Sequence, residues 1–147
     1  MGINMNLNDD QLMDFNSGMT ALADKHYTLA LKLLSPLAEI GVAEAQHRLA
    51  VMYQNGLGVS VNLPEAANWM KKSAENGYDL ALHGMGFMYL EGEGVEKDIN
   101  EAVQWLQKGV NKGLVGSMTV LADLYKQGIG VERDEAEAER LLKLAGF

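Results

Sequence analysis

A spacing of 36 residues recurs along this chain, and it restricts the fold more than any other feature. Gly41, Gly77 and Gly113 stand 36 residues apart, and six further sets of positions follow the same interval. Such a period is typical of repeat proteins, in which each unit buries its apolar face against its neighbours. The other sets are Tyr53, Tyr89 and Tyr125; Gly56, Gly92 and Gly128; Gly58, Gly94 and Gly130; Val59, Val95 and Val131; Ala66, Ala102 and Ala138; and Trp69, Trp105 and Leu141.

Each repeat has the pattern of a helix, a glycine-rich loop and a second helix, here named helix A and helix B. Ala45, Leu49 and Met52 follow helical spacing and predict a helix A over about residues 42–55. Gly56 follows at once and suits a left-handed C-terminal cap. A Gly-x-Gly-Val loop comes next in all three repeats, and its glycines can adopt positive φ angles.

Helix B begins with an N-cap pattern, a small polar residue followed three positions later by a glutamate. The pairs are Asn62 with Glu65, Asp98 with Glu101, and Asp134 with Glu137. Within helix B, Trp69 and Trp105 fall on the apolar stripe and are interpreted as core residues.

Small residues stand where two helices must approach closely. Ala50, Gly86 and Ala122 share one position on helix A, and alanine recurs at one position of helix B. Before Gly41 the pattern changes, because Gly18 and Ala30 take these two positions with a loop four residues shorter. The sequence therefore predicts an all-α fold, an α/α solenoid of about four stacked helical hairpins. We expect a single domain over residues 1–147, with hairpins at about 8–40, 42–76, 78–112 and 114–146.

The composition narrows the possible functions. The 147 residues carry a formal net charge of −8 and no cysteine. This charge argues against nucleic-acid binding, and the absence of cysteine excludes disulfides, thiolate nucleophiles and cysteine-based zinc sites. No apolar stretch approaches the roughly 20 residues of a membrane span.

The N-terminal segment leaves the localisation open. Residues 1–10 contain no basic region followed by an apolar run, so the sequence predicts no signal peptide. A cytoplasmic location is expected if the chain is complete, and a periplasmic or secreted one if a signal peptide was removed.

These residues resemble the Sel-1-like repeat family, which is related to the tetratricopeptide repeat. The segment from Ala81 to Trp105 matches the family pattern closely. That pattern has an alanine, a glycine and a tyrosine in helix A, then the Gly-x-Gly-Val loop, and then Asp, Ala and Trp in helix B. The first hairpin is closer to a tetratricopeptide repeat. The resemblance covers nearly the whole chain and implies a right-handed superhelix that serves as an adaptor or scaffold.

In the resembled fold, the A helices line a concave groove and the B helices form the outer wall. A protein or peptide partner would bind in this groove. For Phe15, Met19 and Leu22, the alternative is packing against the next helix A. The groove positions predicted from the repeat alignment are Phe15, Met19, Leu22, His47, Val51, Gln54, His83, Phe87, Leu90, Glu91, Thr119, Asp123 and Lys126.

The sequence offers little that points to catalysis, a metal or a cofactor. His47 and His83 share one repeat position, but no third ligand accompanies them, so packing or partner contact is expected. The Gly-x-Gly loops lack the third glycine, the preceding strand and the lysine of phosphate-binding loops. We therefore expect no enzyme and no cofactor. Two alternatives stay open: a binder of small ligands or cell-wall fragments, and a self-associating homo-oligomer.

Overall fold

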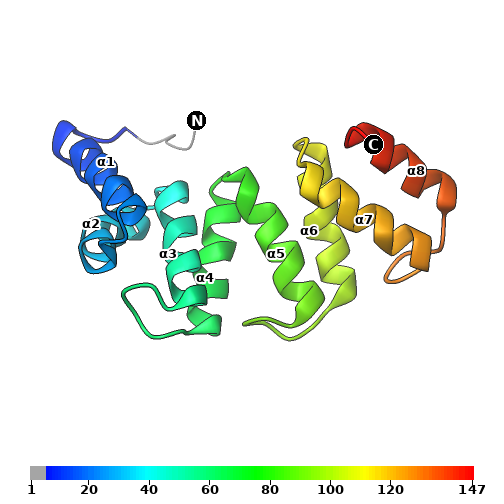
Figure 1. Ribbon diagram of the computed structural model, residues 1–147, viewed down its shortest axis with the longest axis horizontal. Coiled ribbons are helices and arrows are strands. Elements are labelled where there is room, and N and C mark those ends of the chain that lie inside the picture. The colour runs from blue at the N-terminus through cyan, green and yellow to red at the C-terminus, as the bar shows by residue number, and fades with distance from the viewer. Residues whose placement is uncertain (1–5) are drawn as a thin grey trace. The chain divides into compact units, whose positions relative to one another are not determined.

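The computed structural model describes residues 6–147 and contains helices without strands in that range (Figure 1). The all-α prediction is confirmed. Part of the segment searched for a signal peptide, residues 1–5, lies outside the described residues. The described residues form eight helices: α1 (Asp9–Ala23), α2 (Tyr27–Glu39), α3 (Ala43–Asn55), α4 (Leu63–Glu75), α5 (Asp79–Glu91), α6 (Ile99–Asn111), α7 (Val115–Gln127) and α8 (Glu135–Leu144).

The helices form two compact units that divide between Tyr78 and Asp79. In the first unit α1 packs against α2, α2 against α3, and α3 against α4. The second unit has the same order from α5 to α8, and α5 also contacts α7. Each unit therefore holds two helical hairpins around its own hydrophobic core, and α1, α3, α5 and α7 are the A helices.

The predicted N-caps of the B helices are confirmed. The side-chain oxygens of Asn62, Asp98 and Asp134 accept hydrogen bonds from the backbone N–H three residues later, at 3.1, 3.1 and 3.0 Å. In α1 the arrangement is reciprocal, because Asn8 accepts from the Gln11 N–H and the Gln11 side chain accepts from the Asn8 N–H. These bonds satisfy donors that a helix N-terminus otherwise leaves open.

The glycine-rich loops connect helix A to helix B in the same way in each of the last three hairpins. Gly56 has the left-handed conformation expected of the C-cap, with φ of 67°. The Asn62 N–H then donates to the Tyr53 carbonyl at 2.9 Å, and equivalent bonds close the two later loops. Gly58 has a second requirement, because a Cβ there would lie 3.0 Å from the backbone of Tyr27. The loop therefore needs glycine for its conformation and for its close approach to α2.

The small positions lie where helix A meets helix B. Ala30, Ala66, Ala102 and Ala138 are all completely buried. The two tryptophans differ in burial. Trp105 is buried, whereas Trp69 is partly buried and packs against the core of the first unit. The ammonium groups of Lys72 and Lys108 lie over the Trp69 and Trp105 rings, 4.7 and 4.4 Å from the ring centroids.

The core of each unit joins residues from consecutive hairpins. In the first unit Leu34 and Leu37 of α2 cluster with Leu49 and Met52 of α3. In the second, Leu106 of α6 clusters with residues of α7 and α8. None of the helices in the described part of the chain is both long and apolar enough to cross a bilayer.

Candidate interaction surface

The predicted groove residues of α1 lie in or against the core of the first unit. Phe15 is only 7% exposed and belongs to the core cluster. Met19 and Leu22 are half-buried and pack against that cluster. The three side chains therefore contribute mainly to packing among α1, α2 and α3.

The groove positions of α3 are half-buried and include one perturbed histidine. The His47 ring lies 5.0 Å from the Tyr78 ring, measured between centroids. Burial, with a smaller contribution from the neighbouring Arg48 guanidinium, lowers the pKa of His47 to about 4. Arg48 in turn lies 3.5 Å from the Glu44 carboxylate. His47 is therefore a neutral packing residue at pH 7.

The remaining α3 positions present little surface. Val51 and Gln54 are both half-buried. The first unit thus exposes parts of several side chains along α3 and leaves no predicted apolar groove residue fully open to solvent.

In the second unit, His83 fixes the contact between α5 and α7. Its Nδ1 lies 3.4 Å from the Ser117 hydroxyl, and its ring lies directly over Gly116, where a Cβ would come within 3.3 Å. Burial lowers the pKa of His83, so the neutral ring is favoured there too. His47 therefore packs against Tyr78 within the first unit, and His83 packs against Gly116 and Ser117 within the second.

Beyond His83, the surface formed by α5 and α7 is open. Phe87 is 44% exposed on α5, and Glu91 is exposed one turn further on. On α7, Thr119 is half-buried and Asp123 is exposed and accepts a 2.8 Å hydrogen bond from the Gln127 side chain. We call these residues, with Leu80, the α5–α7 surface: Leu80, His83, Phe87, Glu91, Thr119 and Asp123.

Leu80 is an exposed residue that the sequence pattern missed. It is 52% exposed and lies two turns before Phe87, on the same face of α5. The repeat alignment did not indicate an apolar residue here, because the equivalent positions in the neighbouring repeats hold Glu44 and Gly116. The seven-residue spacing to Phe87 was the available signal.

Two predicted groove residues have a different environment. Leu90 packs against the core of the second unit. Lys126 lines a depression of about 490 Å³ between α7 and α8, together with Glu135, Ala136, Glu139 and Leu142. Both side chains therefore belong to the side of the hairpin where a following hairpin would pack.

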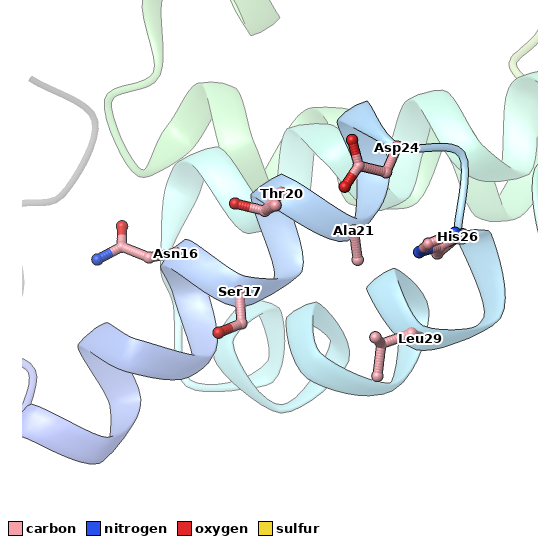
Figure 2. Close-up of a pocket in the computed structure, with 7 residues that line it drawn as sticks. All are labelled: Asn16, Ser17, Thr20, Ala21, Asp24, His26 and Leu29. Atoms are coloured by element: carbon pink, nitrogen blue, oxygen red, sulfur yellow. The ribbon is translucent and has the colours of Figure 1, made fainter.

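A second depression, of about 310 Å³, lies on the first hairpin. Figure 2 shows that its lining comes from the second half of α1 and the start of α2. Within residues 6–147, no group of three or more histidine, aspartate or glutamate side chains is placed to hold a metal ion. The lining residues are Asn16, Ser17, Thr20, Ala21, Asp24, His26 and Leu29.

Comparisons with known proteins agree with this architecture. The family model described as the Sel1 repeat matches residues 43–78, 79–114 and 116–146. A search of curated proteins finds no match. The chain resembles the crystal structure of c5321, a protective antigen present in uropathogenic Escherichia coli strains and described as displaying an SLR fold. The two share 31% identity with a TM-score of 0.88 over 92% of this chain and 30% of that one.

Two further solved structures are similar. A Sel1 repeat protein from Oxalobacter formigenes has 29% identity and a TM-score of 0.85, over 89% of this chain and 54% of that one. Helicobacter pylori cysteine rich protein B has 19% identity and a TM-score of 0.58, over 88% and 86%, which shows the fold alone. The chain thus spans about a third of the length of c5321 and about half of the length of the Oxalobacter formigenes protein. Its fold is a solenoid of helical hairpins, and the chain belongs to the Sel1-repeat family.

Proposed function

We propose that this protein is a scaffold that binds a protein or peptide partner through the α5–α7 surface, with Phe87 as the apolar anchor. The exposure of Phe87 carries the proposal. Among the six apolar groove positions, Phe87 is exposed, whereas Phe15, Met19, Leu22, Val51 and Leu90 are buried or half-buried. Burying a phenylalanine side chain on binding contributes about 1.5–3 kcal/mol.

The surroundings of Phe87 suit an interface. Leu80 extends the apolar stripe on one side, and the carboxylates of Glu91 and Asp123 form a polar edge on the other. An apolar centre with a polar rim is typical of protein–protein interfaces. Because His83 packs against Gly116 and Ser117, α5 and α7 are held together before a partner arrives. Such preorganisation reduces the entropy lost on binding.

The family supports the general role. Sel1-repeat proteins are generally protein-interaction scaffolds and typically lack enzymatic activity. We infer the same for this chain, with a partner that covers α5 and α7 of the second unit. No cofactor takes part in the proposed binding.

Selection of displayed peptides on the immobilised wild-type protein tests the proposal. Enriched peptides would be synthesised with a fluorescent label, and their affinity measured by fluorescence polarisation. We expect Phe87→Glu to weaken binding by tenfold or more, since about 1.4 kcal/mol corresponds to a factor of ten.

Val61→Glu is the matched control, because it places the same charge on another exposed apolar residue, in the α3–α4 loop of the first unit. Both variants should first show the helix content and melting temperature of the wild type. Equal affinities of all three proteins for the selected peptides would exclude the α5–α7 surface as the binding site.

A further inference from the structure

The α5–α7 surface carries negative charge beside its apolar centre. On α5, Glu91 is exposed one turn after Phe87, and the last turn of that helix contains no basic residue. On α7, Asp123 is exposed and accepts a hydrogen bond from the neutral Gln127 side chain. Neither carboxylate takes part in an ion pair within residues 6–147. Both charges are therefore available to a partner.

The two carboxylates lie at the same end of the surface. Figure 1 shows that α5 and α7 run in the same direction, with α6 returning between them. His83 on α5 lies beside Gly116 on α7, and these two positions are 33 residues apart. Leu124 has the same separation from Glu91, and Asp123 directly precedes it. Asp123 therefore lies level with the C-terminal turn of α5.

Both carboxylates depart from the repeat pattern. The equivalent residues of the other two repeats are uncharged: Asn55 and Gln127 for Glu91, and Val51 and Phe87 for Asp123. The C-terminus of a helix carries a partial negative charge, so a carboxylate in the last turn of α5 is unfavourable in the free protein. A cation from a partner would be attracted both to the carboxylates and to the helix ends.

The nearby cations of the second unit do not neutralise this end of the surface. Lys126 is the basic residue of α7, and it lines the depression shared with Glu135 and Glu139 of α8. Lys108 lies over the Trp105 ring on α6. Lys97, in the loop after α5, forms an ion pair with neither carboxylate. The charge of the surface thus favours a partner of opposite sign.

We propose that the partner binds the α5–α7 surface with a basic segment, in which an apolar side chain packs on Phe87 and arginine or lysine side chains pair with Glu91 and Asp123. This inference rests on the proposed partner site and adds the chemistry of its occupant. Arginine suits the site best, because its guanidinium can donate two parallel hydrogen bonds to a carboxylate.

The spacing within the partner segment follows from α5. Phe87 and Glu91 are one turn apart, or about 6 Å along the helix axis. An extended segment covers this distance in about two residues, and a helix covers it in about four. The basic residue should therefore stand about two to four positions from the apolar anchor.

Two libraries of displayed peptides, selected on the immobilised full chain, test the proposal. One library contains all residue types, and the other lacks arginine and lysine. Phe87→Ala identifies the peptides that need the apolar anchor, because it shortens the side chain without changing the charge. We expect such peptides from the first library alone, with a basic residue at the stated spacing. Equally tight, Phe87-dependent peptides from the second library would overturn the proposal.

Labelled peptides from the first library then measure the effect of charge by fluorescence polarisation. Glu91→Gln combined with Asp123→Asn should weaken binding about tenfold at low salt and reduce its dependence on salt, because screening acts on charged pairs. Glu96→Gln combined with Glu132→Gln is the matched control. It removes the same charge from two exposed loop residues that are equivalent in the repeat, and it should bind as the wild type does.

The outcomes separate this inference from the partner site itself. Peptides that need Phe87 but bind the Glu91→Gln, Asp123→Asn variant as tightly as the wild type would overturn the basic segment alone. Peptides that bind Phe87→Ala as tightly as the wild type would overturn the partner site. Glu91→Gln alone should melt at or above the temperature of the wild type, because the last turn of α5 loses an unfavourable charge. A lower melting temperature would show that Glu91 stabilises the fold and would contradict the proposal.

Discussion

Ser117 on α7 occupies the space that a side chain at Gly109 on α6 would need. A Cβ at Gly109 would lie 2.8 Å from the Ser117 Cβ and closer still to its hydroxyl. Ser117 is completely buried, and its hydroxyl also approaches His83. The contact between α6 and α7 therefore depends on this pair of small residues.

We expect Gly109→Ala to destabilise the protein by about 1–3 kcal/mol through overpacking. In an exposed helix the same change would be favourable by up to about 1 kcal/mol, because alanine is the better helix former. Adding Ser117→Gly should recover much of the loss, since it frees the space again. Urea denaturation of the wild type, both single variants and the double variant measures the coupling. Additive effects of the two substitutions would contradict the proposed contact.

Ala102→Glu should unfold the second unit. Ala102 is completely buried where α6 meets α5, and a charge placed there without a partner costs several kcal/mol. Circular dichroism should show a large fall in the melting temperature. Gln104→Glu, on an exposed position of the same helix, is the control. A melting curve for Ala102→Glu that matches the control would contradict the packing described for α6.

The stability of the protein should fall as the pH is lowered from 6.5 to 4. The pKa of His47 is about 4 in the folded chain, below its ordinary value of 6.5, so the unfolded chain binds this proton first. Stability from the neutral ring is complete above pH 6.5 and is lost as the pH falls through 4. The loss is at most about 3 kcal/mol.

The free energy of unfolding, measured by denaturation at several pH values in this interval, should therefore change less with pH for His47→Gln than for the wild type. His26→Gln, which changes an exposed histidine, should follow the wild type. If His47→Gln retains the full pH dependence, other groups account for it.

Asn8→Ala should lower the free energy of unfolding by about 1 kcal/mol, because the Gln11 N–H at the start of α1 loses its acceptor. Asn8→Asp keeps an acceptor oxygen at the N-cap and should retain most of the stability. Hydrogen exchange at the first amides of α1 would locate the effect. Equal exchange rates in the alanine and aspartate variants would show that this cap contributes little.

The repeat spacing was sufficient to predict the helices and the connections between them. Tyr53 and Gly56 recur at fixed intervals, and the position of Asn62 holds Asn or Asp, because the loop closes by local hydrogen bonds and one left-handed glycine. These interactions span only a few residues, so the order of residue types along the chain determines them. The same is true of the N-caps at Asp98 and Asp134.

The exposure of the groove positions could not be predicted in this way. Phe15 and Phe87 both lie off the main apolar stripe of an A helix, yet one is 7% and the other 44% exposed. Spacing indicates the face of a helix on which a residue lies. It does not indicate which other side chains cover that face, because these come from helices distant in the sequence.

What the sequence by itself determined is the repeat, its helices, its loops and its close-packed positions. The tertiary structure decided how close the helices come. Ala50 and Gly86 are equivalent in the repeat, but a Cβ at Gly86 would lie 2.8 Å from the Leu106 side chain. Hydrogen bonds within a hairpin depend on neighbours in the chain, whereas the distance between helices depends on the volumes of all the side chains packed between them.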